Sequence, residues 1–296
     1  MAKNRIDKAM ESVPGFKRMF SKYTQYMQLH QRSEQTIRSY SYRFASICLH
    51  FGRTPETYTA DEISDYLGYV MQQDKMNSTS SFKHIVYSLK LFYKFMNIQP
   101  PKNLTLPKLA KEQRLPIVLS FDETRDILTK TTDLREKTIL AMLYSCGLRQ
   151  SELRNLRMED IDFSRNLVYI RQAKGKKIRC IELGKNMKKV LGRYISVYKP
   201  KNYIFTLEYT DLPMGKYAIR GLVSRSGERA GITKHLTPHI FRHTYATHLL
   251  EMGVSIYRLK ELLGHSNIVN TMVYLHIIKP AEEVSFSPID CLFPVK

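Results

Sequence analysis

The sequence contains few cysteines, and their spacing fits neither a metal site nor a disulfide framework. Its 296 residues include only Cys48, Cys146, Cys180 and Cys291, and none belongs to a Cys-x-x-Cys motif. Structural zinc sites group their cysteine ligands at such short spacings, and disulfide-built domains depend on many paired cysteines. We therefore expect a reduced protein with no metal and no other cofactor.

Long apolar segments are also missing. Residues 1–8 are rich in charge and lack the apolar centre of a signal peptide, and no apolar run approaches the length that spans a bilayer. The chain has no internal repeat and no low-complexity segment. We expect a cytoplasmic protein that does not act at a membrane.

Acidic residues are scarce relative to basic ones. The chain has 47 Lys and Arg against 27 Asp and Glu, a formal net charge of +20. The excess is not confined to a tail: residues 1–115 contain 18 basic and 9 acidic residues, and the remainder contains 29 and 18. Such a charge favours a polyanionic partner, and we expect both halves to contact DNA.

The length suits two domains. The predicted linker is residues 101–116, whose prolines and lysines make a continuous helix unfavourable. Residues 1–100 form the predicted N-terminal helical domain, and residues 117–296 form a second domain that includes a C-terminal tail, 281–296. The tail mixes apolar residues with prolines, so we expect it to bury itself on its own domain or on a neighbour.

Helical periodicity runs through the N-terminal domain. An apolar stripe lies between a capping residue, Ser33, and a terminating glycine, Gly52. A second helix follows the capping box Thr59–Glu62, and a third is predicted over residues 82–95. These stripes predict the core of a small helical bundle.

His239 and Arg242 lie in the first turn of a predicted helix. Thr237 is a good N-cap, Pro238 suits the first helical position, and Gly253 is placed to end the helix. Two residues three apart share one helix face, and the free amides and dipole of a helix start favour an anion. The alternative is an ordinary capped surface helix.

Arg149 and Glu152 are also three apart, after an apolar stretch, residues 139–144, that predicts a buried helix ending at Gly147. The carboxylate can orient the guanidinium without removing its charge. The alternative is a surface ion pair, which stabilises a helix by only a few tenths of a kcal/mol.

Two β-rich runs, residues 166–172 and 177–183, flank a basic turn and predict a hairpin. Lys174 lies at its tip, where its ammonium could reach a bound substrate or could simply be solvated. Further along, Gly264 should end a short helix just before His265, and Ser266 should cap the next helix, which carries Tyr274. A lone tyrosine there fits a core position as well as a catalytic one.

Taken together, these motifs resemble the tyrosine recombinase, or phage integrase, family, in its Xer-like and integrase-type forms. The resemblance rests on five features in this order: GLRQSEL, the AKGK turn, TPHIFRHTYATHLL, LLGHS, and Tyr274, nine residues after His265 of LLGHS. It spans roughly residues 117–276. One departure is residues 267–271, which replace a commoner Ser/Thr-rich segment and which we expect to alter only a helix start.

The resemblance implies the site and the architecture. The fold is expected to be mainly α with a small β-sheet or hairpin: an N-terminal helical bundle of the core-binding, SAM-like type and a mixed α+β catalytic domain. Glu152 would lie behind Arg149, and Tyr274 would be the nucleophile. The residues expected around the scissile phosphate are Arg149, Lys174, His239, Arg242 and His265.

The expected reaction follows from these groups. A free phenol has a pKa of about 10, so neighbouring cations are expected to favour its anion. Two arginines on the non-bridging oxygens would replace Mg²⁺, and the lysine would protonate the departing 5′-oxygen. The covalent 3′-phosphotyrosyl ester keeps the bond energy, so strand exchange between two DNA sites needs no ATP.

The expected partners are double-stranded DNA with an inverted-repeat core site and further copies of the chain. We expect a dimer on each site, a tetramer at synapsis, association with the nucleoid when DNA is bound, and a place for accessory DNA-bending proteins. Two alternatives remain open at this point. One is a type IB topoisomerase-like enzyme that relaxes DNA, and the other is a non-catalytic DNA-binding regulator on the same fold.

Overall fold

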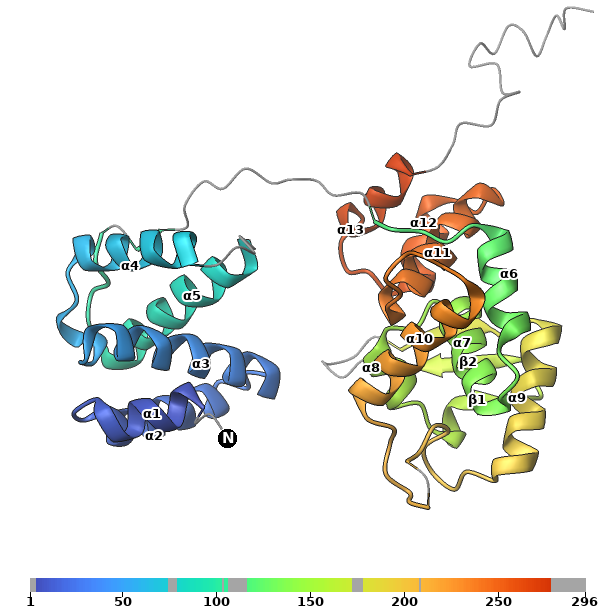
Figure 1. Ribbon diagram of the computed structural model, residues 1–296, viewed down its shortest axis with the longest axis horizontal. Helices are drawn as coiled ribbons and strands as arrows, with labels where there is room; N and C mark the ends of the chain where they lie inside the picture. Colours follow the sequence, from blue (N-terminus) through green and yellow to red (C-terminus); the bar gives the residue numbers. More distant parts are fainter. Residues whose placement is uncertain are drawn as a thin grey trace, which may run out of the picture. The chain divides into compact units, whose positions relative to one another are not determined.

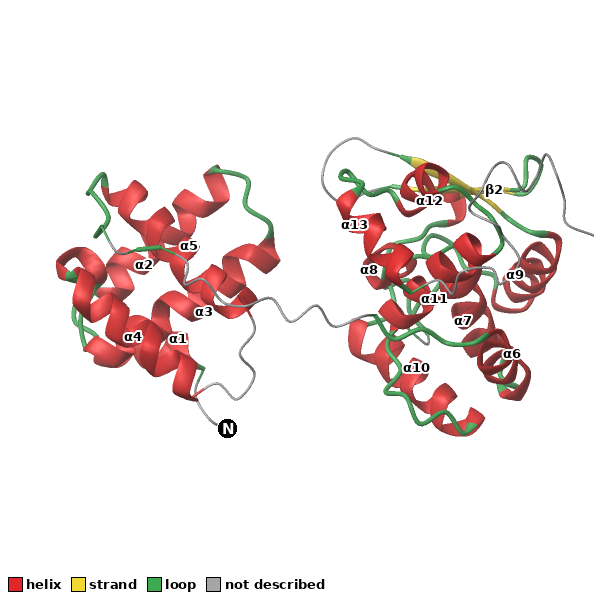
Figure 2. Ribbon diagram, turned by 90° about the horizontal axis from the view of Figure 1, so that it is seen from above, coloured by secondary structure: helices red, strands yellow, loops and turns green. Residues whose placement is uncertain are grey.

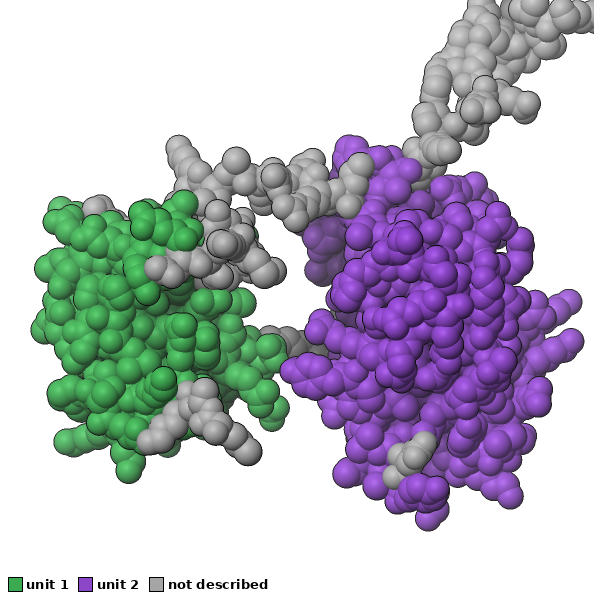
Figure 3. All heavy atoms as spheres, in the orientation of Figure 1, with its two compact units in different colours: residues 1–113 green, residues 114–296 purple. Residues whose placement is uncertain are grey.

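The computed structural model describes residues 4–73, 79–102, 104–105, 116–171, 178–207 and 209–277. The chain divides into two compact units, residues 1–113 and 114–296, each with its own core (Figures 1 and 3). Within the described residues no helix combines the length and apolar character needed to cross a membrane.

The first unit is a bundle of helices. They are α1 (Arg5–Ser12), α2 (Phe16–Leu29), α3 (Glu34–Phe51), the 3-10 turn η1 (Pro55–Thr57), α4 (Ala60–Gln73) and α5 (Thr79–Met96). Aromatic rings fill its core: Tyr23 lies 5.1 Å from Phe44 and 5.6 Å from Phe92, measured between ring centroids.

The predicted helix starts and stops in this unit are confirmed. The Ser33 hydroxyl accepts the Thr36 amide, and Gly52 ends α3 with a left-handed φ of 66°. The capping box is closed by the Thr59 amide on Glu62 and the Glu62 amide on the Thr59 hydroxyl. Two further helices, α1 and α2, precede Ser33 and complete the bundle; the individual helices predicted from the sequence began only at Ser33.

The second unit combines helices with a small sheet. The helices are α6 (Phe121–Lys130), α7 (Leu134–Ser145), α8 (Gln150–Arg154), α9 (Lys185–Tyr198), α10 (Lys216–Ala230), α11 (Pro238–Glu251), α12 (Ile256–Leu263) and α13 (Val269–Met272), with 3-10 turns η2 (Met158–Asp160) and η3 (Val273–His276). Helix α7 packs against α9 and α11 in the centre of the unit. The prediction of a mainly helical fold with a small sheet is confirmed.

The sheet is antiparallel, with strand order β1 (Ile161–Asp162), β2 (Leu167–Ile170) and β3 (Arg179–Glu182). Val168 pairs with Ile181, which confirms the predicted hairpin. The turn that carries Lys174 lies outside the described residues. Along β3 the residues alternate between buried and exposed, so Arg179 faces inward with Ile181. Figure 2 shows the sheet on one side of the unit, with α12 next to it.

Gly147 turns the chain from the buried helix α7 toward α8. Its φ is 54°, a left-handed conformation that L side chains seldom adopt. A Cβ atom at this position would also overlap the ring of Tyr245 on α11. A glycine is therefore required where α7 and α11 meet, two residues before Arg149.

We predict that Gly147→Ala costs more stability than Gly231→Ala. Both glycines have a left-handed φ, which costs about 1–2 kcal/mol for an L residue. Only at position 147 does the new methyl group overlap a neighbour, which adds about 1–3 kcal/mol of overpacking. Urea unfolding of the two variants measures the difference, and equal losses would show that the Tyr245 ring moves aside without cost.

Candidate active site

The start of α11 presents two candidate residues with opposite exposure. Pro238 is its first residue and Thr237 is its N-cap in extended conformation, as predicted, although the Thr237 side chain makes no capping hydrogen bond. The helix ends at Glu251, and Gly253 follows with a φ of 84°. His239 is exposed in the first turn, whereas the side chain of Arg242 is only 3% exposed.

The buried guanidinium of Arg242 ties three segments together. Its Nη1 donates to the carbonyl of Gly147 at 2.6 Å, and its Nη2 donates to the carbonyl of Leu263, at the end of α12, at 2.7 Å. Burial, reinforced by the positive charge of Arg149, lowers the pKa of Arg242 to about 10. The guanidinium is therefore still charged at neutral pH, and it places a fixed cation beneath the α11 terminus.

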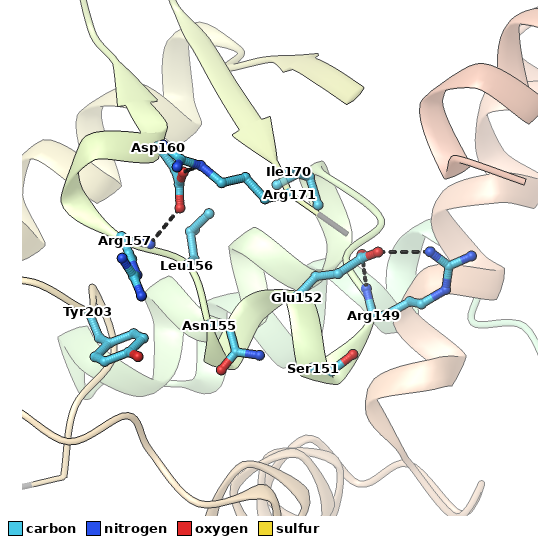
Figure 4. A pocket seen from close by; sticks show the side chains of 10 residues that line it. All are labelled: Arg149, Ser151, Glu152, Asn155, Leu156, Arg157, Asp160, Ile170, Arg171 and Tyr203. Atoms are coloured by element: carbon cyan, nitrogen blue, oxygen red, sulfur yellow. Dashed lines mark hydrogen bonds and ion pairs between the residues drawn. The ribbon is translucent and has the colours of Figure 1, made fainter. Parts of the chain in front are cut away.

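Glu152 is the anion that makes this cluster of cations stable. Its carboxylate accepts the Arg149 amide at 2.8 Å and the Arg149 guanidinium at 2.7 Å (Figure 4). It also accepts two bonds from Arg179, at 2.9 and 2.7 Å, and lies 3.8 Å from Arg242. Burial raises the pKa of Glu152, but the hydrogen bonds and charge of Arg179 and Arg149 outweigh it and bring the pKa to about 2.

Sequence reasoning missed Arg179. Its guanidinium is buried, and it contacts Glu152 from β3 rather than from a neighbouring helix turn. The sequence feature that could have revealed it is a basic residue at an inward-facing position of a strand whose residues alternate between buried and exposed. Such a position buries a charge, which is costly without an ionised partner.

His265 lies between Arg242 and Thr271. Gly264 ends α12 with a φ of 63°, as predicted. The Arg242 guanidinium only donates, so His265 Nε2, at 3.1 Å, accepts, and Nδ1–H donates to the Thr271 hydroxyl at 2.9 Å. Burial, followed by the charge of Arg242, lowers the pKa of His265 to about 4, so the ring is neutral.

Two expectations for this segment were wrong. Ser266 does not cap the next helix; the Asn267 side chain accepts the Val269 amide at 3.0 Å instead. Residues 267–271 also do more than alter a helix start, because Thr271 anchors His265. Their short helix then passes into η3, so Tyr274 lies in a 3-10 turn rather than on a continuous helix.

Tyr274 is almost fully buried. It is 2% exposed and packs in a small cluster with Tyr245, Leu259 and Leu263. Burial raises its pKa, and the charges of Arg242 and Arg149 only reduce that rise. The two arginines therefore favour the phenolate, as expected, but desolvation is the larger effect and leaves the pKa of Tyr274 above its ordinary value.

The hydroxyl of Tyr274 has a partner that the sequence did not reveal. It lies 3.0 Å from Nδ1 of His243, one helical turn after His239. The ring centroids of His239 and His243 are 6.1 Å apart, and the ring planes are inclined by 27°. The position four residues after His239 was the only hint that His243 belongs to the same face.

The structure brings together all the candidate residues that it describes. A continuous network joins Arg149, Glu152, Arg242 and His265. On the same helix as Arg242, the ring of His239 stacks with that of His243, and His243 contacts the hydroxyl of Tyr274. The Arg149 side chain is 33% exposed and borders a hollow along α8 that is also lined by Asn155, Arg171 and Tyr203 (Figure 4). Lys174 lies outside the described residues, so its place in the network stays a prediction.

Comparison with known proteins gives consistent matches along the chain. Residues 113–280 match the Phage integrase family, and residues 19–98 match the phage integrase N-terminal SAM-like domain. The chain is 32% identical to tyrosine recombinase XerA of Pyrococcus horikoshii, over 88% of this chain and 89% of that protein.

Solved structures show the same architecture. A crystal structure of XerA recombinase is 28% identical to the chain, with a TM-score of 0.52 over 88% of this chain and 93% of that one. A lambda integrase dimer bound to a COC′ core site shares the fold at 18% identity. Its TM-score is 0.71, over 91% of this chain and 80% of that one.

We predict that Glu152→Gln destabilises the second unit by about 3–5 kcal/mol at pH 7, because it leaves buried guanidiniums without their anion. The carboxylate has a pKa of about 2 in the folded protein, below its ordinary value. Its stabilisation is therefore complete above about pH 5 and is lost as the pH falls toward 2. Urea unfolding at several pH values should show wild type and variant converging in acid.

The matched control is Glu261→Gln. Glu261 forms an ion pair with Arg258 at 3.0 Å, but both side chains are exposed. Its loss should cost less than about 1 kcal/mol, because water screens the pair. Similar losses for the two variants would show that the buried network does not depend on the charge of Glu152.

Proposed function

Because the chain belongs to the Phage integrase family, we propose that it is a site-specific tyrosine recombinase, which cleaves and rejoins DNA through a covalent 3′-phosphotyrosyl intermediate. The observation that carries the proposal is the arrangement of the second unit. A buried arginine network ends at the N-terminus of α11, and a tyrosine hydroxyl lies beneath it. This arrangement suits a bound phosphodiester and an attacking phenol oxygen.

The scissile phosphate would lie against the exposed end of this network. Arg149 and His239 are its accessible donors. The start of α11 adds free backbone amides and the positive end of the helix dipole. Arg242 contributes its charge from below, since Gly147 and Leu263 already hold its terminal nitrogens. Positive groups fixed in advance stabilise the charge that builds up on the phosphoryl oxygens.

Tyr274 would attack the phosphorus and keep the DNA 3′-phosphate as an ester, while the 5′-oxygen departs. In the proposal, Lys174 protonates that oxygen, an assignment that rests on the resemblance of the AKGK turn. The attack of another strand's 5′-hydroxyl on the ester reseals the backbone without ATP. Since Tyr274 is 2% exposed, η3 or the side chains covering it must shift when DNA binds.

The proposed partner is double-stranded DNA with an inverted-repeat core site. A two-fold pair of chains would occupy each site, two sites would form a tetramer at synapsis, and accessory bending proteins would act on the flanking DNA. The tail, residues 281–296, is proposed to dock on the adjacent chain. It lies outside the described residues, and the proposal rests on its apolar sequence and the family resemblance.

Two other functions are less well supported. A non-catalytic regulator has no use for a buried tyrosine hydroxyl next to an arginine network. A topoisomerase-like enzyme would share the chemistry, but the relatives that the chain matches across both units are recombinases.

We predict that Tyr274→Phe abolishes the covalent DNA adduct and changes DNA affinity by less than about twofold, because only the nucleophilic oxygen is removed. Denaturing electrophoresis after incubation with genomic DNA fragments measures the adduct, and sequencing of the trapped DNA maps the site. Tyr245→Phe is the control and should retain the adduct, because Tyr245 packs in the same cluster but its hydroxyl has no assigned role. An adduct that persists in Tyr274→Phe would assign the nucleophile to another tyrosine.

We also predict recombinant product from two copies of the mapped site without ATP. Product requires both cleavage and exchange of partners, so this assay separates the recombinase from both alternatives. The measurement is the length of labelled duplexes after deproteinisation, with a supercoiled plasmid relaxation assay alongside. Relaxation without recombinants would favour the topoisomerase-like function, and neither activity, with DNA binding intact, would favour the regulator.

A further inference from the structure

Nδ1 of His243 lies within hydrogen-bond distance, 3.0 Å, of the hydroxyl of Tyr274. We propose that His243 is a further catalytic residue, which accepts the phenol proton of Tyr274 as the phosphorus is attacked. The inference rests on the proposed function and adds to the residues assigned there.

The burial of Tyr274 determines which atom donates in this contact. Tyr274 is 2% exposed, so water is not at hand to accept its hydroxyl proton. A buried hydroxyl proton without an acceptor is costly, whereas a hydroxyl oxygen tolerates an unused lone pair better. The phenol therefore donates to Nδ1 of His243 at 3.0 Å, and the imidazole carries its own proton on Nε2.

The surroundings of His243 keep its lone pair available. Burial is the main effect, and the charges of His239 and Arg242 on α11 add to it, lowering the pKa of His243 to about 4. The ring of Tyr274, on η3, packs against the imidazole as well, with 5.6 Å between the ring centroids. The ring is thus a neutral acceptor before DNA binds, and the negative charge of an arriving phosphodiester raises its affinity for a proton.

The proposed step is balanced. The Tyr274 Oη–H bond breaks as the Oη–P bond forms, and the proton moves to Nδ1 of His243. The P–O5′ bond breaks and the 5′-oxygen takes a proton from Lys174. Resealing runs in reverse: the attacking 5′-hydroxyl gives its proton to Lys174 and forms the O5′–P bond, the Oη–P bond breaks, and His243 returns its proton to Oη.

The other two histidines of the site are less suited to this role. His265 already uses both ring nitrogens, one toward Arg242 and one toward Thr271. His239 is exposed, and its ring centroid is 6.1 Å from that of His243. Its position fits a contact with the phosphate better than a contact with Oη.

The test is the pH dependence of single-turnover cleavage by full-length His243→Asn. The asparagine amide occupies nearly the position of Nδ1 and can still hydrogen-bond to Oη, but it cannot accept the proton. The substrate is a nicked duplex of the genomic sequence that wild type traps, which prevents resealing. At pH 7 we expect adduct formation to be slower by about 100-fold or more, as for other losses of general acid–base catalysis.

The pH profile separates proton transfer from positioning. Without a base, the reaction depends on the phenolate fraction, so the His243→Asn rate should rise about tenfold per pH unit between pH 6.5 and 9. Wild type should rise much less steeply over the same range. Added imidazole should accelerate His243→Ala, because the small base fills the vacated space, and it should not accelerate wild type.

The matched control is His248→Asn, on the same helix. His248 also contacts a tyrosine hydroxyl, that of Tyr144, with Nδ1 at 2.9 Å, but the pair lies outside the site. After correction for the folded, DNA-bound fraction, this variant should keep the wild-type rate and the shallow profile.

Several results would overturn the inference. If His243→Asn keeps the wild-type slope, the proton goes elsewhere, and a steep slope for His239→Asn instead would assign it to His239. Faster cleavage by His243→Asn would show that the contact restrains the nucleophile. If wild type forms no adduct at all, the proposed function fails and this inference fails with it, whereas a normal wild-type adduct with unchanged variants refutes the inference alone.

Discussion

The structure of the site depends on the burial of Arg242. A guanidinium removed from water needs acceptors for its N–H groups and an anion to balance its charge. Here the carbonyls of Gly147 and Leu263 are the acceptors, and the carboxylate of Glu152 is the anion. Each partner belongs to a different segment, so the position of α11 fixes the α7–α8 turn and the end of α12 as well. Arg149 and His265 are placed by the same contacts.

The placement of charge divides the site into a fixed part and an accessible part. Glu152 stays ionised and compensates Arg179 and Arg242, which leaves the cluster with more positive than negative groups. The partly exposed guanidinium of Arg149 places this excess positive charge at the surface, where a phosphodiester could contact it. In the proposed function, the buried part holds the geometry before DNA binds, and the exposed part would contact the phosphodiester.

Short sequence motifs predicted the helix ends that position most of the site residues. They did not predict the side-chain contacts between segments that are distant in the sequence. Gly147, Gly264 and Pro238 mark the ends of helices through their own backbone preferences, so their roles could be predicted from neighbouring residues. Arg179 and His243 act through partners that are distant in sequence, Glu152 and Tyr274. No periodicity specifies such pairs, because they form only when the strand and helices pack.

The burial of Tyr274 connects the fold to the chemistry. Desolvation raises the pKa of the Tyr274 phenol, so in the protein without DNA this side chain is a poor nucleophile despite the nearby charges of Arg242 and Arg149. An anionic phosphate bound at the start of α11 would change this balance, because its charge favours a protonated imidazole next to the phenol. In this mechanism the substrate activates the nucleophile that attacks it, and the tyrosine stays protonated until DNA occupies the site.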